Sequence, residues 1–253
     1  MSGDAIEFDG VTKEYPLPRT SARVRALDGV SVTIPVGAVV GVLGPNGSGK
    51  TTFLDVIAGL TRASSGRAMV LGRPSGDRLV REQLGYASGE GGLPDHLTGH
   101  EALMWWARLR GDPLGDARER SQSLLERVGL AGAGARRRGD YSRGMKQRLA
   151  WAQAIMFSPP LVILDEPYAG IDVDGMDTLD HIIADLKRDG TTVVFSSHQL
   201  QSVANVCDRV VLLTGGKLLA EGDLLEMAQT PNRREIRMDE IYREKWSEAR
   251  KVQ

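Results

Sequence analysis

The run Ala38-Val39-Val40-Gly41-Val42-Leu43, followed by Gly44-Pro45-Asn46-Gly47-Ser48-Gly49-Lys50-Thr51, decides the fold of this chain. The first six residues are almost all apolar, which is typical of a strand buried on both faces of a parallel sheet. From Thr51 to Ala58 the apolar residues recur with helical spacing. Residues 44–51 fit the pattern G-x-x-x-x-G-K-[ST] at every position. The sequence therefore predicts a strand, a glycine-rich loop and a helix in succession.

This loop has the chemistry to hold the phosphates of a nucleotide. Its glycines let backbone N–H groups converge on phosphate oxygens, and the helix that follows adds the positive end of its dipole. We expect Lys50 to meet the β- and γ-phosphates and Thr51 to offer its hydroxyl to Mg²⁺. A P-loop alone does not distinguish a kinase, a GTPase or a motor. The predicted phosphate-binding residues are Gly44, Pro45, Asn46, Gly47, Ser48, Gly49, Lys50, Thr51 and Thr52.

A second acidic site follows another apolar run, Leu161 to Leu164, which ends in Asp165 and Glu166. This is the order expected of a Walker B element. We predict that Asp165 holds Mg²⁺ directly or through water. Glu166, offset by one residue, is predicted to orient and deprotonate a water aimed at the γ-phosphate. Two acids can also merely end a strand in solvent, but the P-loop ahead of them favours the catalytic interpretation.

Composition limits the remaining possibilities. The chain has 253 residues, of which 41% are hydrophobic and 26% charged, as in soluble globular proteins. Its net charge of −1 provides no positive field for nucleic acid. The single cysteine, Cys207, cannot form an internal disulfide. The first residues lack the features of a secretory signal, and the longest apolar stretch, Val32 to Gly44, is shorter than the about 20 residues that cross a bilayer. We expect a cytoplasmic location without direct membrane insertion.

The remaining pattern predicts an α/β fold with a mostly parallel sheet. Ala5–Phe8 and Val30–Ile34 alternate around the polar stretch Pro16–Arg25, which indicates an N-terminal antiparallel pair with an enlarged hairpin loop. The run Thr192–Phe195 is a further buried strand, preceded by a helix over Asp177–Arg188.

The sequence also predicts a helical insertion, a hairpin near the end of the domain and a C-terminal tail. No buried strand is evident over 89–154, where Glu101–Arg110 and Ala117–Val128 have helical periodicity, so we predict an inserted helical subdomain. A turn at Thr214-Gly215-Gly216 predicts a closing hairpin. Residues 1–230 are then a single domain, and 231–253 a C-terminal amphipathic helical tail with Ile236, Ile241, Tyr242 and Trp246 among charges.

The octapeptide Tyr141-Ser142-Arg143-Gly144-Met145-Lys146-Gln147-Arg148 resembles the signature motif of ATP-binding cassette (ABC) proteins. The resemblance covers essentially the whole chain, and this form of the motif is similar to that of stand-alone cassettes from bacterial drug, ion and polysaccharide exporters. It implies that Ser142 and Gly144 contact the γ-phosphate of an ATP held by another cassette. Taken alone, Ser142 fits an ordinary helix N-cap.

Further site residues follow from the same resemblance. Tyr15 corresponds to the aromatic residue that stacks on adenine, Asp172 to the aspartate that crosses the dimer, and His198 to the switch histidine at the γ-phosphate. One position departs from the family pattern, because Gly89 stands where a glutamine normally coordinates Mg²⁺. Either the adjacent Glu90 takes this role or water completes the metal shell. Tyr168-Ala169 is also unusual, since many relatives carry small or polar residues there.

The resemblance implies a subunit that hydrolyses ATP to ADP and phosphate. Two cassettes, either two copies of this chain or one with a paralogous cassette, would close over two ATP molecules and drive a transmembrane permease subunit at the inner face of the cell membrane. The permease would enter a groove near Tyr86 to Trp106, although Trp105 and Trp106 fit a buried core as well. Export follows only from the subgroup. The alternative is a soluble ABC ATPase that powers cofactor assembly of the iron–sulfur type.

Overall fold

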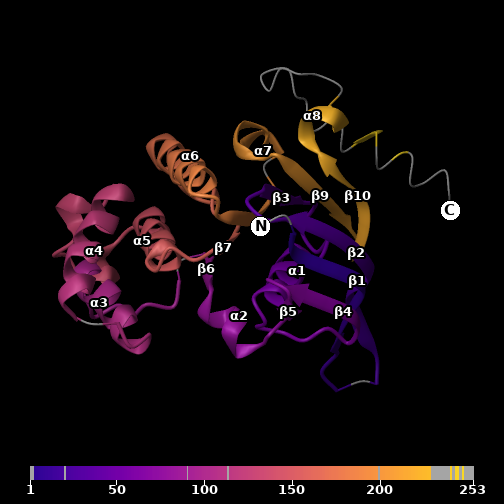
Figure 1. Cartoon of the computed structure of the whole chain (residues 1–253), viewed down its shortest axis with the longest axis horizontal. Helices are drawn as coiled ribbons and strands as arrows, with labels where there is room; N and C mark the ends of the chain where they lie inside the picture. Colours follow the sequence, from indigo (N-terminus) through magenta and orange to yellow (C-terminus); the bar gives the residue numbers. More distant parts are fainter. Residues whose placement is uncertain are drawn as a thin grey trace.

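The computed structural model describes residues 3–19, 21–89, 91–112, 114–198 and 200–228, together with the isolated positions 240, 243, 244 and 247. Two β-sheets and the helices around them make up this structure (Figure 1). The α/β fold class predicted from the sequence is confirmed. The predicted tail helix at 231–253 lies outside the described residues, except for those isolated positions.

A six-stranded sheet, in the order β10-β9-β3-β8-β7-β6, carries the P-loop. All neighbouring strands are parallel except β9 and β10, which form the predicted closing hairpin. The P-loop leaves the carboxyl end of β3, which is buried along its whole length. The strands are β3 (Val39–Leu43), β6 (Leu84–Ser88), β7 (Leu161–Asp165), β8 (Thr192–Ser197), β9 (Arg209–Thr214) and β10 (Lys217–Asp223).

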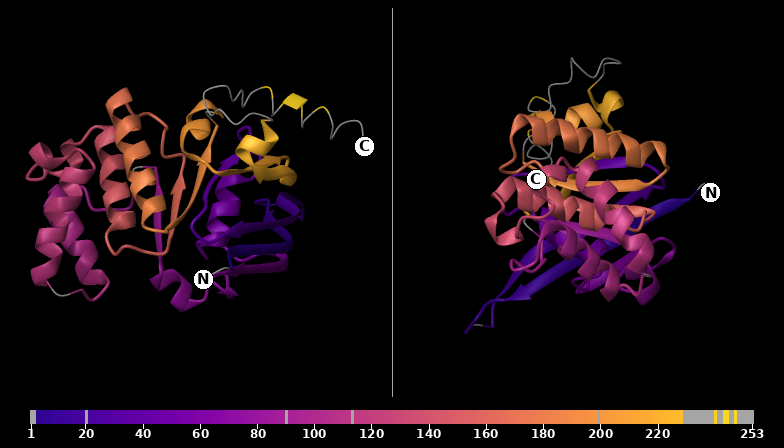
Figure 2. Two further views of the ribbon diagram at one scale, coloured as in Figure 1. Left: turned by 45° about the horizontal axis from the view of Figure 1, so that its top comes forward. Right: turned by 90° about the vertical axis from the view of Figure 1, so that its left-hand side faces the viewer.

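A smaller antiparallel sheet, in the order β2-β1-β4-β5, confirms the predicted N-terminal strand pair. Its hairpin loop is shorter than expected, because β1 continues to Pro16 and β2 begins at Arg23. The ladder is extended by the cross-strand pair Glu14–Arg25, whose Oε1 and Nη2 lie 3.1 Å apart. The hairpin projects from the body of the molecule (Figure 2, right). The strands are β1 (Asp4–Pro16), β2 (Arg23–Pro35), β4 (Ser65–Val70) and β5 (Arg73–Pro74).

Helix α1 (Lys50–Ile57), which follows the P-loop, lies in the core between the two sheets. Alternate residues of β3 face opposite sides, so Val40 and Val42 pack in a core with Phe53 and Leu54 of α1 and with the small sheet. On the other face, Val39 and Leu43 belong to a second core that includes residues of α6 and α7. Burial on both faces explains the nearly continuous apolar run of β3.

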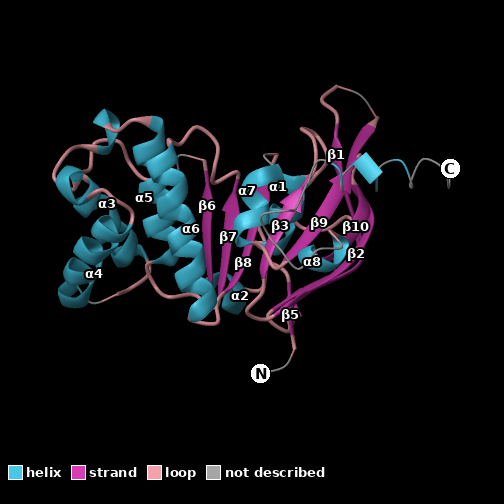
Figure 3. Ribbon diagram, turned by 90° about the horizontal axis from the view of Figure 1, so that it is seen from above, coloured by secondary structure: helices cyan, strands magenta, loops and turns pink. Residues whose placement is uncertain are grey.

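Three longer helices, α3 (Gly99–Leu109), α4 (Leu114–Arg127) and α5 (Arg143–Ile155), gather beyond the β6 edge of the large sheet (Figure 3). They occupy the stretch predicted to be helical, although their status as a subdomain remains a prediction. A capping box of Thr98 and Glu101 starts α3. The other helices are α2 (Arg78–Glu82), α6 (Val173–Arg188), α7 (Leu200–Val206) and α8 (Leu224–Met227), with 3₁₀ turns η1 (Ala131–Ala133) and η2 (Arg138–Asp140).

Helix α6 begins four residues earlier than the predicted Asp177, because Asp172 accepts a hydrogen bond from Gly175 N–H and caps the first turn at Val173. Within the parts of the chain that the structure describes, no helix combines the length and apolar character needed to span a membrane.

Candidate nucleotide site

The P-loop needs its glycines for steric reasons. Gly47 and Gly49 have φ angles of 80° and 103°, a region that residues with a Cβ rarely adopt. A Cβ on Gly49 would also lie 2.5 Å from the carbonyl oxygen of Ala26 on β2. Ser48 is almost fully buried, and its Oγ has no hydrogen-bond partner among the described residues. Because buried hydroxyls are normally paired, this orphaned group fits a site that receives phosphate oxygens.

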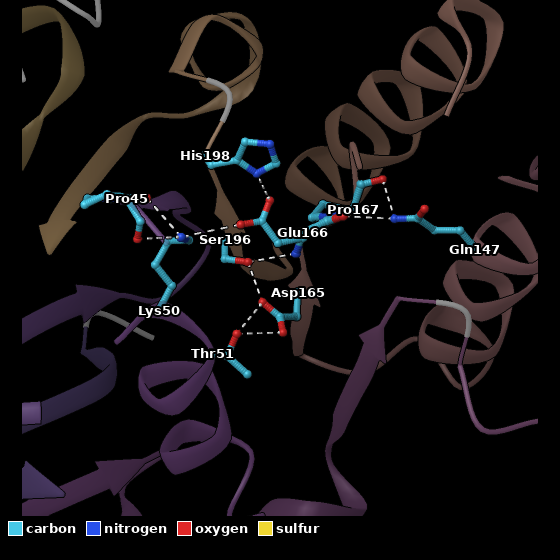
Figure 4. Close-up of polar contacts among 10 residues, drawn as sticks. Pro45, Lys50, Thr51, Gln147, Asp165, Glu166, Pro167, Ser196 and His198 are labelled. Atoms are coloured by element: carbon cyan, nitrogen blue, oxygen red, sulfur yellow. Dashed lines mark hydrogen bonds and ion pairs between the residues drawn. The ribbon is translucent and has the colours of Figure 1, made fainter. Parts of the chain in front are cut away.

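Lys50 brings a positive charge into the middle of this loop. The residue is 6% exposed, and its Nζ donates to the carbonyl oxygens of Gly44 at 2.9 Å and Pro45 at 3.3 Å. The same Nζ lies 3.5 Å from Glu166 Oε1 (Figure 4). A buried ammonium group is stable only when it is paired in this way. Lys50 is therefore poised over the P-loop, and phosphate oxygens can replace its carbonyl partners.

Asp165, at the end of β7, joins the P-loop helix to β8. The Thr51 hydroxyl lies 3.1 Å from its Oδ2, and Ser196 Oγ donates to its Oδ1 at 2.6 Å (Figure 4). A carboxylate beside a threonine hydroxyl is an oxygen donor set of the kind that Mg²⁺ prefers. Thr51 and Asp165 therefore fit the metal that the sequence predicts.

Glu166 is held in an unfavourable backbone conformation, with a φ of 48°. Ser196 Oγ accepts a hydrogen bond from its N–H at 2.7 Å. The side chain of Gln147 donates from Nε2 to the carbonyl oxygens of Glu166 and Pro167, at 3.0 and 2.8 Å. On the carboxylate, Oε2 lies 2.7 Å from Nδ1 of His198, whose side chain is half-exposed. The predicted base and the predicted switch histidine are therefore in direct contact.

Sequence reasoning missed Ser196 and Gln147. Ser196 bridges the two acids, and Gln147 is 3% exposed on α5. Ser196 could have been found as a polar residue at the carboxyl end of a buried strand that neighbours Asp165. Gln147 could have been found as a polar side chain on the apolar face of a predicted helix. Gln147 is part of the signature octapeptide, but the octapeptide does not reveal that its side chain bonds to the backbone of Glu166 and Pro167.

The residues predicted to reach another cassette do not join this cluster. Ser142 caps α5 and accepts a hydrogen bond from Met145 N–H at 3.2 Å. Asp172 caps α6 in the same way. Gly144 lies beside Gly170, since a Cβ on Gly144 would be 3.7 Å from the Gly170 carbonyl oxygen. Among the described residues no hydrogen bond links these positions to the P-loop, and α5 lies on the far side of β6 and β7 from α1 (Figures 1 and 3).

Tyr15, the residue predicted to stack on adenine, is partly exposed to solvent. Tyr15, on the projecting hairpin, is 37% exposed, and the ammonium group of Lys13 lies 4.8 Å from its ring centroid.

Gly89 has a φ of 47° and carries no side chain that could bind a metal. Glu90, the predicted substitute, lies outside the described residues. Nearby, the hydroxyl of Tyr86 donates to Asp55 Oδ1 on α1 at 3.1 Å, and burial raises the pKa of Tyr86 above its ordinary value.

The two tryptophans of α3 differ in their surroundings. Trp106 packs against the core and lines a groove of about 280 Å³ with Tyr86, Arg110 and Leu60. Trp105 is 37% exposed and lines a separate cavity of about 620 Å³ between α3 and α4. The core interpretation is therefore wrong for Trp105, because the helical period turns neighbouring residues of α3 toward different surroundings.

The P-loop follows the central parallel strand β3, and the two acids come at the end of β7, which is separated from β3 by β8 alone. This arrangement defines a P-loop nucleoside-triphosphate-binding protein. The family model of the ABC transporter matches residues 27–169. The chain belongs to this family, as the signature octapeptide predicted.

Individual relatives agree with this assignment. The chain is 41% identical, over 83% of its length, to an uncharacterized ABC transporter ATP-binding protein of Nostoc sp.. It is 34% identical, over 88% of its length, to the doxorubicin resistance ATP-binding protein DrrA of Mycobacterium tuberculosis. The chain spans only 63% of the Nostoc protein and 67% of DrrA. A solved structure of a dimeric bacterial ABC transporter cassette is 25% identical, with a TM-score of 0.80 over 87% of this chain and 98% of that one.

Proposed function

We propose that this chain is the ATP-hydrolysing subunit of an ABC transporter, that it works as a pair of cassettes closed over two ATP molecules, and that it drives a separate transmembrane permease in export. The observation that carries the proposal is the convergence of Lys50, Asp165, Glu166 and His198 at the carboxyl edge of the large sheet. A phosphate-binding cation, a metal-binding carboxylate and a candidate base within one cluster are the parts that hydrolysis of a triphosphate needs.

Binding begins with the P-loop. Its N–H groups and the Ser48 hydroxyl receive phosphate oxygens, and Lys50 exchanges its bonds to the carbonyl oxygens of Gly44 and Pro45 for the β- and γ-phosphates. Thr51 and Asp165 would hold Mg²⁺. When bound, this ion neutralises phosphate charge that would otherwise repel a nucleophile. Because Gly89 has no side chain that could bind the ion, Glu90 or water would complete the coordination shell of Mg²⁺.

Hydrolysis then depends on Glu166. Its carboxylate accepts a proton from a water molecule, whose oxygen forms a bond to the γ-phosphorus while the bond from that phosphorus to the bridging oxygen breaks. The electron pair of the broken bond leaves with ADP. Nδ1 of His198 lies 2.7 Å from Oε2 of Glu166, while Oε1 of the same carboxylate faces Lys50. His198 thereby orients the carboxylate toward the γ-phosphate. Gln147 and Ser196 keep the Glu166 backbone in the strained conformation that aims this side chain.

The second half of each site comes from another cassette, either a second copy or a paralogue. Ser142 and Gly144 lie at the start of α5, where N–H groups and the helix dipole favour an anion, and Asp172, which caps α6, is the residue that crosses the cassette pair. The similarity to a dimeric bacterial cassette supports this arrangement. Closure can be driven only by contacts that distinguish ATP from ADP, which means contacts with the γ-phosphate.

The permease docks in the groove lined by Tyr86, Trp106 and Arg110, at the inner face of the cell membrane. Opening and closing of the cassette pair would then move its transmembrane helices. The direction of transport is supported by DrrA, which is named for doxorubicin resistance.

The test is the release of phosphate from ATP by the purified chain with Mg²⁺, measured over a wide range of dilution. If sites form only between cassettes, the rate per chain falls on dilution below the dissociation constant of the pair. A chain that releases no phosphate at any concentration, or that keeps its full rate per chain at every dilution, contradicts the proposal.

A further inference from the structure

Tyr168 lies two residues after Glu166 and is almost fully buried, at 2% exposure. Its ring packs at an angle of 57° on Phe195 of β8, with the ring centroids 5.8 Å apart. Its hydroxyl donates a hydrogen bond of 2.5 Å to Oδ1 of Asp180, in the middle of α6. The turn that carries Glu166 is therefore attached to both β8 and α6 through one side chain.

This hydrogen bond joins a neutral hydroxyl to a carboxylate. Burial raises the pKa of the Tyr168 hydroxyl well above its ordinary value, so Tyr168 stays protonated and donates. Burial and the neighbouring Asp177 raise the pKa of Asp180, whereas the bond from Tyr168 and the nearby His181 favour its charged form. Hydrogen bonds to charged acceptors are stronger than neutral ones, and their loss in a buried place leaves a group without a partner.

The bond from Tyr168 to Asp180 also closes a loop that contains the surface facing a second cassette. Residues 169–172 run between the two anchors, and Asp172 caps α6 at the far end of this loop. The start of α5 packs on the same loop, because a Cβ on Gly144 would lie 3.7 Å from Gly170 O. Arg148 Nη2 lies 3.9 Å from Asp172 Oδ2. Glu166, the start of α5 and the start of α6 are thereby linked in one body.

We propose that Tyr168 is a positioning residue: its bond to Asp180 fixes the loop 169–172 relative to Glu166, so that closure onto a second cassette and correct aim of the base occur together. The inference rests on the proposed function. In this proposal the buried Tyr168 acts through the turn that it anchors and not by contact with the nucleotide. A small displacement of a catalytic group lowers the reaction rate by a large factor. Loss of the bond between Tyr168 and Asp180 should therefore lower turnover.

The experiment compares the wild-type chain with Tyr168→Phe, which keeps the ring on Phe195 and removes the hydroxyl, and with Asp180→Ala, which removes the acceptor. We expect turnover to fall on the order of tenfold to a hundredfold in both. In a Glu166→Gln background, ATP-driven dimerisation measured by sedimentation should weaken by at least about tenfold. ATP affinity of the dilute single chain, measured by calorimetry, should stay within about twofold, because the P-loop is unaltered. Asp180→Asn, which keeps the accepting oxygen, should restore most of the turnover.

A matched control is Ser121→Ala. Ser121 is fully buried in α4, and its hydroxyl contacts His100 Nδ1 at 3.1 Å, away from the site. If Tyr168 were only structural, Tyr168→Phe and Ser121→Ala would lower the melting temperature while turnover and dimerisation stayed like wild type, and this result would overturn the inference. If Tyr168→Phe does not fold, Asp180→Ala against Asp180→Asn decides the same question. A wild-type chain without ATPase activity would defeat the proposed function itself, and this inference with it.

Discussion

The P-loop side and the signature side of this molecule are built differently. On the P-loop side, Lys50 and Glu166 are bonded to partners that come from distant parts of the same chain. On the signature side, Ser142 and Asp172 bond to the first turns of their own helices, and the Asp172 side chain remains 66% exposed. The first region is a closed cluster of bonded side chains, whereas the polar groups of the second do not bond to the P-loop among the described residues. This difference is what we expect if, as proposed, the second region completes the site of another cassette.

The contrast also separates two kinds of effect that a substitution can have. A change on the P-loop side should alter how a single chain binds or cleaves ATP. A change on the signature side should alter only what a pair of chains does.

The largest effect is expected for Glu166→Gln. Glutamine keeps the size of the side chain but cannot accept a proton, so turnover should fall on the order of 10²- to 10⁴-fold while ATP still binds. Phosphate release and calorimetric ATP binding measure the two properties. Glu126→Gln, at an exposed carboxylate of α4, is the control. Turnover like wild type in Glu166→Gln would remove Glu166 from its catalytic role.

A somewhat smaller effect is expected for Ser142→Ala. If the Ser142 hydroxyl contacts the γ-phosphate across the cassette pair, as proposed, its loss should lower turnover on the order of 10²-fold, as the loss of a preorganised donor does elsewhere. ATP affinity of the dilute chain should not change, because within the described part of the chain no hydrogen bond joins Ser142 to the P-loop. If Ser142→Ala instead lowered the ATP affinity of the dilute chain and left turnover intact at high protein concentration, Ser142 would belong to the P-loop side and not to the signature side.

Tyr15→Ala should act on the P-loop side alone. If Tyr15 stacks on adenine, its removal weakens ATP binding by about 1–3 kcal/mol, taking the magnitude known for stacking on nucleic-acid bases. Calorimetry on the dilute chain measures this loss, and Tyr15→Phe, which keeps the ring, should bind like wild type. An unchanged affinity in Tyr15→Ala would exclude the stacking role.

The smallest effect is expected for Thr98→Ala, which removes a helix cap like that of Ser142 but at the start of α3. The free energy of unfolding, measured by chemical denaturation, should fall by about 1 kcal/mol, which is the usual cost of a lost N-cap. Turnover should stay within about twofold. Equal losses of turnover in Thr98→Ala and Ser142→Ala would mean that Ser142 serves only as a cap.

The features that the sequence predicted well are local. The P-loop, the acids after β7 and the strand–loop–helix succession are continuous segments whose spacing is dictated by backbone geometry and phosphate chemistry. His198 was predicted from the family resemblance, and the structure brings it to Glu166. Local spacing therefore located the segments that meet at this cluster, while the metal and base roles of Asp165 and Glu166 remain predictions.

The features that were missed depend on contacts between distant segments. Ser196 and Gln147 act on Glu166 from β8 and α5, and neither relation is visible in a short window. The hairpin strands extend beyond their apolar alternation because Glu14 and Arg25 continue the ladder with charges. For Trp105 the sequence left a groove and the core as alternatives, and only the packing of α3 against α4 decides which face of the helix is covered.

The most direct test of the two-sided site is a mixing experiment. Glu166→Gln and Ser142→Ala chains are each assayed alone and then combined, with phosphate release as the readout. In a mixed pair, one site joins the intact Glu166 of the second variant to the intact Ser142 of the first. We predict that the mixture hydrolyses ATP well above the sum of the separate rates. A mixture that gives only that sum, although the mixed pair is seen to form by sedimentation, would contradict the account.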